Sequence, residues 1–389
     1  MTWRVIKAMD QKRDFLKAWL EKKFYLTDLC KQFGIGSTCA YKLISRFKEE
    51  GWDCLEERSR APHNSPYKTS DSLEQAILAL KYERSRWGPK KILGHLQNTF
   101  ADRPWPSVTT IENILKKHGL VEKRKLKRRL AKAASPCDHS NSSNEVWCMD
   151  FKGWWLTPEN EKIAPFTLTD SFSRFILSCE KLTLNNTTHV WGVLERLFRE
   201  YGLPLRIKSD NGPPFASLGP GRLSRLSINL IKAGVQPEWI DPGEPQQNGR
   251  HERMHLTLKQ EGVDSGLLFK DQKKRLEDFV HYFNFIRPHE ALNQKPPSQI
   301  YKPSTRVWHG LLRSPEYPNE YRVGKVKNCG KMSWRNREIY IGRVFAGEPI
   351  GLKVDSEKIE AYYGPIFLGT VDTNNLNIER RPGRMKLKI

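Results

Sequence analysis

The order of strand and helix patterns from Glu145 onward most constrains the fold of this chain. Three apolar runs, VWCMDF, KIAPFTLTD and RFILSCEKL, read as consecutive strands, and a hairpin turn at 171–173 joins the last two. A helical pattern at about 187–201 leads to the strand LRIKSD, which is followed by a helix near 223–233, the strand VQPEWI and a helix from about 245 to 261. Strands in a row and then alternating helices and strands predict an α/β domain, in which helices cover a mixed five-stranded sheet.

The N-terminal patterns predict a helical DNA-binding unit. Residues 10–50 read as three short helices, with a stop at Gly34 after the second and a cap at Ser37 before the third. Two short amphipathic helices joined by a glycine-containing turn are typical of a helix-turn-helix. Its outward face, expected in a major groove, consists of Thr38, Tyr41, Lys42 and Ser45. The alternative is a small helical bundle with a solvated polar face.

A second helical unit is expected after the loop RSRAPHNSPYKTS. Its first helix is predicted at about 71–85, and two more helices are predicted to begin at Pro89 and at Pro106. This arrangement resembles a second helix-turn-helix, with a weaker signal than the first. The outward side chains of its last helix are Thr109, Asn113 and Lys116. The run VEKRKLKRRLAK then holds seven basic residues and one acidic residue. It is either a solvated tether or a phosphate-binding segment, and we expect phosphate contact from Lys123, Arg124 and Lys125.

Short strand-like pieces with regular turns fill the chain from about Tyr321 and predict a small C-terminal β-barrel. A basic tail follows it at the end of the sequence. The chain is therefore expected to be multidomain, with N-terminal all-α helix-turn-helix units, an α/β core and this β domain. The first helix-turn-helix domain is expected at 1–62 and the second such unit at 66–120. A basic linker at 121–144 leads to the α/β core at 145–300, and the β domain follows at 301–389.

The charge of the chain favours nucleic acid as a partner. The formal net charge is +22, and residues 1–144 hold 29 Lys and Arg against 16 Asp and Glu. An acidic membrane is the poorer alternative, since no apolar run approaches the ~18 residues of a membrane span. The seven cysteines form no CxxC pair, so neither a disulfide framework nor a zinc site is indicated. We expect a cytoplasmic protein.

Three carboxylates stand out in the α/β region. Asp150 lies in its first strand, Asp210 ends its fourth strand in SDNGPPF, and Glu252 lies on the helix that follows. The first and fourth strands of an open sheet can be neighbours, so all three acids are expected to converge. Converging carboxylates repel unless a cation lies between them, and such oxygen ligands suit Mg²⁺. Two Mg²⁺ ions about 4 Å apart would serve phosphodiester displacement. A structural ion pair between Asp210 and Lys208 is the alternative.

The choice of the third acid rests on helix geometry. Between Asp210 and Glu252 there are 41 residues, and Glu244, with 33, is the rival. Glu244 precedes a proline at the helix entrance, whereas Glu252 lies in the helix body. Lys259 follows Glu252 by seven residues, nearly two turns, so both are expected on one face, where Lys259 would hold the DNA backbone. We therefore prefer Glu252.

Three further residues near these acids are assigned other roles. Asp170 stands at a β-turn beside Ser171 and is expected to cap that turn. His251 and His255 flank Glu252 without partners at metal-ligand spacing, so we expect them to contact DNA or solvent.

Three motifs together, DFKG, SDNGPPF and NGRHERMHLTLK, resemble the catalytic blocks of bacterial insertion-sequence transposases of the DDE type with a retroviral-integrase-like core. The resemblance implies an RNase H-like fold and an Asp-Asp-Glu triad that binds Mg²⁺, with Mn²⁺ as a substitute. Asp150, Asp210 and Glu252 fall on the triad positions. It also implies a homo-oligomer on paired DNA ends, and a bacterial, nucleoid-associated location.

The predicted function is that of a DNA transposase. Its N-terminal units would bind the terminal repeats of an element, and its core would hydrolyse a phosphodiester and direct the freed 3′-OH at target DNA. A DNA-binding regulator with a relic core and a plain nuclease are the alternatives. Joined donor–target products would separate the first function from both.

Overall fold

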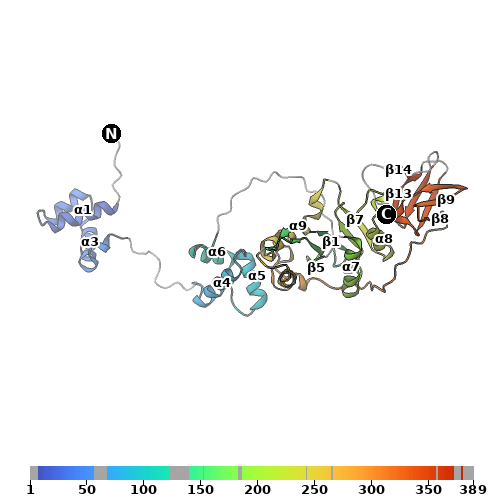
Figure 1. The fold of residues 1–389 in the computed structure, drawn as a ribbon. Helices are drawn as coiled ribbons and strands as arrows, with labels where there is room; N and C mark the ends of the chain where they lie inside the picture. The colour runs from blue at the N-terminus through green and yellow to red at the C-terminus, as the bar shows by residue number, and fades with distance from the viewer. Residues whose placement is uncertain are drawn as a thin grey trace, which may run out of the picture. The chain divides into compact units, whose positions relative to one another are not determined.

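The computed structural model describes residues 8–56, 68–121, 140–151, 153–182, 186–241, 243–263, 266–355, 358–371 and 378–379 (Figure 1). The chain divides into two compact units, Met1–Thr69 and Ser70–Ile389. Lys123, Arg124 and Lys125, the predicted phosphate contacts of the basic run, lie outside the described residues. Within the described part, no helix is both long enough and apolar enough to span a membrane.

The first unit is a three-helix domain, as predicted. Its helices are α1 (Ala8–Leu20), α2 (Leu26–Phe33) and α3 (Ser37–Glu50), followed by the 3-10 turn Gly51–Leu55. Gly34 ends α2 with φ of 63°, a left-handed conformation that suits glycine. Ser37 is the first residue of α3 rather than its cap, because Gly36 takes the cap position and no side chain caps the helix. The buried core consists of Phe15, Leu16, Leu29, Cys30, Ala40, Ile44 and Cys54.

The second helical segment belongs to the same compact unit as the α/β core. It consists of α4 (Asp71–Glu83), α5 (Pro89–Thr99) and α6 (Val108–Lys117). Proline at the first position starts α5, and the Ser107 hydroxyl caps α6 by accepting from the backbone N–H of Thr110 at 3.3 Å. Isoleucine and leucine side chains of all three helices, with Trp87, form one buried cluster.

An aromatic and ionic cluster is among the contacts by which this helical segment packs on the core. The indole N–H of Trp87 donates to the Tyr282 hydroxyl at 2.8 Å, and their rings stack. The Tyr282 hydroxyl donates to Glu261 Oε2 at 2.6 Å, and Arg287 Nε lies 3.2 Å from the same oxygen. The Arg84 guanidinium lies over the Tyr282 ring, 4.8 Å from its centroid. We call these five residues the docking cluster; they join α4 and its following turn to the core.

The core is a mixed five-stranded sheet, as predicted. Its spatial order is β5-β4-β1-β6-β7, in which β1 is antiparallel to β4, β4 to β5, and β1, β6 and β7 are parallel. The strands are β1 (Val146–Phe151), β4 (Pro165–Asp170), β5 (Ile176–Lys181), β6 (Arg206–Ser209) and β7 (Gln236–Trp239). The predicted strand KIAPFTLTD is divided in two: Lys162–Ile163 forms β3, which pairs with β2 (Trp155–Leu156) in a small hairpin, and Pro165–Asp170 forms β4.

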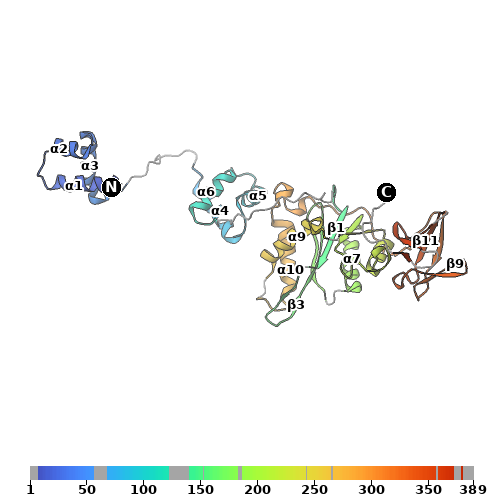
Figure 2. The ribbon, with the colours of Figure 1, turned by 90° about the horizontal axis from the view of Figure 1, so that it is seen from above.

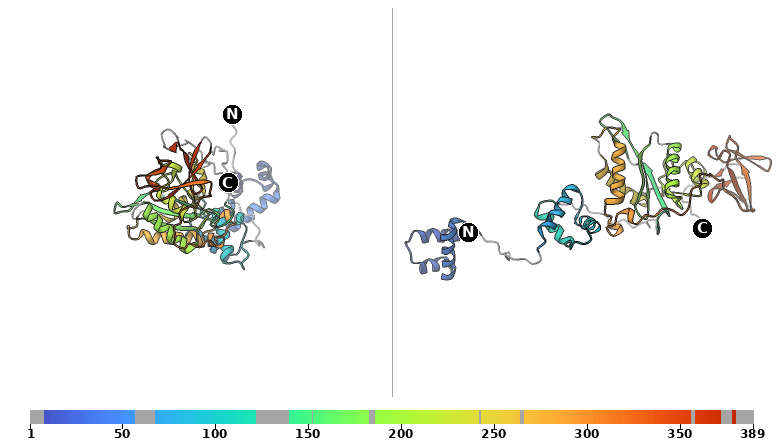
Figure 3. Two further views of the ribbon diagram at one scale, coloured as in Figure 1. Left: turned by 90° about the vertical axis from the view of Figure 1, so that its right-hand side faces the viewer. Right: turned by 90° about the horizontal axis from the view of Figure 1, so that it is seen from below.

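Helices cover both faces of this sheet (Figures 2 and 3). On one face, α7 (Thr187–Tyr201) and α8 (Arg225–Lys232) pack against alternate apolar residues such as Trp147, Met149 and Ile207. On the other face lie α9 (Gly249–Thr257) and α10 (Gln272–His281). The helix expected over 245–261 is broken into three parts, because a 3-10 turn, Pro245–Asn248, precedes α9 and a π-helical turn, Leu258–Gly262, follows it. A second π-helical turn, Tyr282–Ile286, extends α10.

The C-terminal β domain differs from the predicted barrel. Among the described residues, its main sheet is open, with the order β14-β13-β12-β11-β8, and a separate hairpin pairs β9 with β10. The strands are β8 (Tyr321–Lys325), β9 (Lys331–Trp334), β10 (Arg337–Tyr340), β11 (Pro349–Val354), β12 (Ile359–Tyr363), β13 (Ile366–Val371) and β14 (Ile378–Glu379). The sheet packs on α8, where Lys232 forms a 2.8 Å ion pair with Glu348. The remaining 3-10 turns are Pro220–Arg222, Glu290–Leu292, Pro297–Gln299 and Arg343–Phe345.

Candidate active site and DNA interface

The two predicted catalytic aspartates are brought together by the pairing of β1 with β6. Cys148 lies opposite Lys208 in this parallel ladder. Extending the register by two residues places Asp150 opposite Asp210, at the carboxyl ends of both strands. Neighbouring strands lie roughly 4.8 Å apart, and residues in the same register point to the same face. The two carboxylates therefore project side by side from one edge of the sheet.

The face that carries Asp150 is the one covered by α9. Asp150 pairs with Thr167 on β4, and the Thr167 hydroxyl lies 2.8 Å from His251 Nε2 and 2.7 Å from His255 Nε2. His255 Nδ1 is 3.8 Å from Asp150 Oδ2. The helix that carries Glu252 thus packs on the strand that carries Asp150, as the predicted convergence requires.

The prediction for the two histidines is wrong. His251 and His255 are 1% and 8% exposed, so they hold α9 to the sheet rather than meet DNA or solvent. His251 Nδ1 also lies 2.7 Å from the Thr169 hydroxyl. The Thr167 hydroxyl donates its one proton to the Asp150 carbonyl at 3.0 Å, so both imidazoles donate to it through Nε2. Burial, and then the nearby His255, lower the pKa of His251 well below its ordinary value, and the ring is neutral.

Asp210 lies at the start of a tight turn. Its Oδ1 accepts from the backbone N–H of Gly212 at 3.0 Å, and the Asn211 side chain donates to the Ile240 carbonyl at 2.8 Å. Phe215, at the other end of SDNGPPF, is buried and stacks on Phe151. The motif therefore anchors the strand end and leaves the Asp210 carboxylate partly exposed.

Lys208, the alternative partner proposed for Asp210, forms an ion pair with Glu238. Lys208 is 3% exposed, and its Nζ lies 2.9 Å from Glu238 Oε1 on β7. Glu238 also accepts from Arg206 at 3.3 Å. A buried lysine is thus balanced by a carboxylate of the neighbouring strand, as buried charges require.

Glu252 is exposed on α9, as is Lys259 in the π-helical turn that follows. The phase expected between them assumed a continuous α-helix, which the change at Leu258 interrupts. Glu244 precedes the turn Pro245–Asn248 and is outside α9. Among the described residues, no three His, Cys, Asp or Glu side chains are grouped so that they could hold a metal ion. The register of β1 and β6 places the two aspartates side by side, whereas Glu252 does not form a metal-binding group with them in this structure.

Asp170 caps the turn between β4 and β5, as predicted. Its Oδ2 accepts from the backbone N–H and the hydroxyl of Ser173, at 2.8 Å and 2.5 Å, and its Oδ1 accepts from Asn144 N–H at 2.8 Å. The residue is 1% exposed, and burial raises the pKa of its carboxyl although these hydrogen bonds lower it. Its role is structural.

The predicted DNA-reading faces of both helical units are open to solvent. On α3, the whole predicted set is exposed: Thr38, Tyr41, Lys42 and Ser45. On α6, the exposed set is Thr109, Asn113 and Lys116. Lys116 Nζ lies 2.8 Å from Glu112 Oε1 one turn earlier, an exposed pair that a phosphate can replace.

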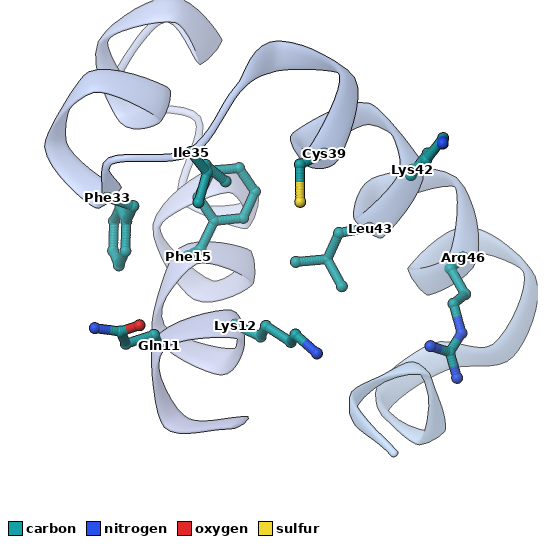
Figure 4. A pocket seen from close by; sticks show the side chains of 9 residues that line it. All are labelled: Gln11, Lys12, Phe15, Phe33, Ile35, Cys39, Lys42, Leu43 and Arg46. Atoms are coloured by element: carbon teal, nitrogen blue, oxygen red, sulfur yellow. The ribbon is translucent and has the colours of Figure 1, made fainter. Parts of the chain in front are cut away.

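A hollow of about 300 Å³ lies between α1 and α3 (Figure 4). Its apolar lining includes Phe15 and Leu43, and Lys12, Lys42 and Arg46 supply basic groups. Arg46 is held by Glu50 at 3.0 Å, whereas Lys42 has no ion pair within the described residues. The Lys42 charge is therefore available for a phosphate on the outward side of α3.

Comparisons with known proteins agree with this architecture. Residues 140–245 and 233–297 each match a family described as integrase core domain, and residues 39–115 match a homeodomain-like domain. An uncharacterized protein of insertion element IS476 from Xanthomonas euvesicatoria is 26% identical over 245 residues, which are 60% of this chain and 66% of that protein. One of insertion element IS407 from Burkholderia multivorans is 24% identical over 247 residues, 60% of this chain and 82% of that protein. These matches support a bacterial insertion-sequence transposase with an integrase-like core.

Viral proteins are also similar to parts of this chain. The Gag-Pro-Pol polyprotein of simian retrovirus SRV-2 is 27% identical over 149 residues, 37% of this chain and 8% of that protein. The chain is also similar to a structure of a simian T-cell lymphotropic virus intasome, at 15% identity and a TM-score of 0.38, over 77% of this chain and 99% of that one. The HTLV-2 integrase catalytic core in complex with magnesium gives a TM-score of 0.32 at 15% identity, over 42% and 100%.

Proposed function

We propose that the chain is an active DDE transposase, which cleaves DNA at the ends of its element and joins the freed 3′-OH to target DNA. The observation that carries the proposal is the β1–β6 register, which puts Asp150 opposite Asp210 at one sheet edge. Two ionised carboxylates side by side repel one another, and a fold keeps such a pair where a cation neutralises it. The edge also lies beside α9, which supplies the third acid.

The donor set fits Mg²⁺, with Mn²⁺ as a substitute. Carboxylate oxygens are the ligands that these hard cations prefer, and Asp150, Asp210 and Glu252 would hold two ions. When bound, the ions would activate the attacking oxygen and stabilise the leaving one. Since Glu252 is not gathered with the aspartates here, we propose that its exposed side chain joins them when DNA and metal bind.

The residues of the chain itself would position the DNA. The exposed faces of α3 and α6 would bind the terminal repeats, and Lys259 would hold the backbone near the acids. Thr167 and the two buried histidines keep α9 seated on the sheet, so the helix that carries Glu252 has a defined place. Water and the 3′-OH are the nucleophiles, and no covalent enzyme intermediate is needed. We propose a homo-oligomer that holds two element ends.

Asp210→Asn tests this proposal. The substitution keeps the size of the side chain and removes one ligand charge, so metal-dependent cleavage should fall by several orders of magnitude. The Asn carbonyl can still accept from Gly212, so thermal unfolding should be unchanged. End binding should persist. Cleavage, end-binding affinity and unfolding are measured on one preparation, with Mg²⁺ and with Mn²⁺.

Asp241→Asn is the matched control. Asp241 follows the neighbouring strand β7, is exposed, and accepts from Gln247 at 3.0 Å, so its substitution changes the charge of the same sheet edge by the same amount. This variant should cleave like the wild type. A folded Asp210→Asn protein that cleaves at the wild-type rate would contradict the catalytic assignment. A wild-type protein that binds ends and never cleaves would support a DNA-binding regulator.

A further inference from the structure

A basic pocket lies at the opposite end of β1 from the acidic pair. Its volume is about 320 Å³, and its lining combines Arg174, Arg250 and Lys295 with Ser140, Phe172, Ala291, Leu292, Asn293 and Ile300. The lining includes three cations and no acidic residue. The backbone N–H of Ser171 donates to the carbonyl of Val146, four residues before Asp150, so the pocket is roughly 13 Å from the acidic pair along the strand.

Arg250 is anchored by one edge of its guanidinium. Its Nη1 donates to the Ser171 carbonyl at 3.0 Å, to Ser140 Oγ at 3.1 Å and to Ser171 Oγ at 3.3 Å. Among the described residues, Nε and Nη2 of Arg250 have no hydrogen-bond partner. A guanidinium that is fixed on one side and has donors left on the other is pre-organised for a phosphate.

The second wall of the pocket is held in place by α5. Asn98 donates to the Gln294 carbonyl at 2.9 Å, and Lys90 forms a 2.7 Å ion pair with Glu290. Gly94 lets this loop approach closely, because a Cβ there would lie 2.5 Å from Gln294 Cβ. Lys295 follows directly on this loop. Its ammonium group is exposed and has no ion pair within the described part of the chain.

Further cations lie near the pocket. Burial, together with the charges of Arg287 and Arg253, lowers the pKa of Lys91 to about 8, although the charges of Glu261 and Glu290 oppose this shift. Burial also lowers the pKa of His289 to about 3, with added effects of Arg287, Lys91 and Arg174. Burial is the main cause of both shifts, and Arg287 adds positive charge beside both groups.

We propose that this pocket binds a phosphate of the DNA backbone through Arg250, Lys295 and Arg174. The proposal rests on the proposed function for the identity of the ligand as DNA. The distance from the acidic pair corresponds to about four base pairs of duplex rise. The pocket would therefore hold the strand away from the reacting bond and fix the direction in which DNA leaves the core.

Lys295→Gln is the main test, because the exposed side chain can be changed without disturbing the fold, and Arg250→Gln is the second. Full-length protein is titrated with end DNA over a series of salt concentrations. Removal of one phosphate-binding charge should reduce the log–log salt slope by about 0.9 and weaken binding roughly 5–10-fold at 0.1 M salt. Lys274→Gln, an exposed lysine on α10 with the same charge change, should leave the slope unchanged.

A second arm separates DNA from free phosphate. Inorganic phosphate replaces chloride at constant ionic strength, and it should weaken DNA binding by the wild type more than by Lys295→Gln. An unchanged salt slope in both pocket variants would overturn the proposal, even if they bind inorganic phosphate less well. All binding is measured in the Asp210→Asn background as well. A failure of catalysis therefore cannot be mistaken for a failure of the pocket.

Discussion

Glu261→Gln should weaken the packing of the helical segment α4–α6 on the core and lower the Tm of the protein. Glu261 accepts from Tyr282 and pairs with Arg287, whose side chain is 9% exposed. The substitution keeps the shape and leaves the arginine charge without a buried counter-charge, which costs about 3–5 kcal/mol. Because each kcal/mol lowers Tm by roughly 2–4 °C, Tm at pH 7 should fall by about 6 °C or more. Thermal unfolding followed by circular dichroism measures this.

The pH dependence adds a second check. Burial raises the pKa of Glu261, but the charge and hydrogen bonds of Arg287 and the Tyr282 hydroxyl outweigh it, so the pKa is lowered from 4.5. A lowered carboxyl pKa stabilises the fold above the unfolded value, and this contribution is lost as pH falls through the folded value. The Tm difference between wild type and Glu261→Gln should therefore shrink as the pH falls below 4.5.

The control for this experiment is an exposed ion pair. Glu277→Gln removes the partner of Lys273, which lies 3.8 Å away one turn earlier on α10. Such pairs contribute at most about 1 kcal/mol, so its Tm should stay close to that of the wild type. If Glu261→Gln had the same Tm as the Glu277→Gln control at every pH, the argument that the docking cluster stabilises the fold would be refuted.

The remaining predictions concern catalysis and end binding. Glu252→Gln should abolish strand transfer, measured as joined donor–target product, whereas Glu244→Gln should retain much of it because Glu244 lies outside α9. The reverse pattern would mean that the third acid is misassigned. Lys42→Gln and Lys116→Gln should each reduce the log–log salt slope of end binding by about 0.9. Unchanged slopes in both would remove α3 and α6 from the DNA interface.

The pairing of the aspartates could be predicted from the sequence because it follows from strand order. Asp150 lies near the end of the first strand pattern, and Asp210 ends the fourth. Few sheet topologies with this order of strands and helices keep the first and fourth strands apart. The position of Glu252 on a helix after the last strand was likewise predicted. Its distance from the aspartates could not be predicted, since it depends on how α9 is seated on the sheet through buried contacts of His251 and His255 with Thr167.

The histidines show a signal that was available but read wrongly. His251 and His255 are four residues apart, so they lie on one helix face, and Thr167 and Thr169 alternate on one strand face. Matching polar faces of this kind indicate a buried hydrogen-bonded contact. The expected contact with DNA or solvent rested on the lack of partners at metal-ligand spacing, and apolar periodicity alone does not identify a helix face that is buried by polar pairs.

The docking cluster and the open C-terminal sheet depend on contacts between distant residues. Trp87 and Tyr282 are 195 positions apart, and each fits its local helix pattern as an ordinary apolar residue. Strand patterns from Tyr321 onward give the number and spacing of strands, but closure of a sheet depends on pairing between its first and last strands. Local pattern therefore predicted the elements, and the long-range packing decided how they were joined.

The two helical units have different physical relations to the core. α6 belongs to a segment whose burial on the core runs through the docking cluster, so DNA bound on α6 would have a fixed geometry toward Asp150 and Asp210. The first unit is compact by itself, and DNA bound on α3 would raise the local concentration of the end. Neutralising Lys116 on α6 should then shift where the DNA is cut, whereas neutralising Lys42 on α3 should change how often an end is held. Both substitutions should weaken end binding, and a shift in cleavage position is expected for Lys116→Gln alone.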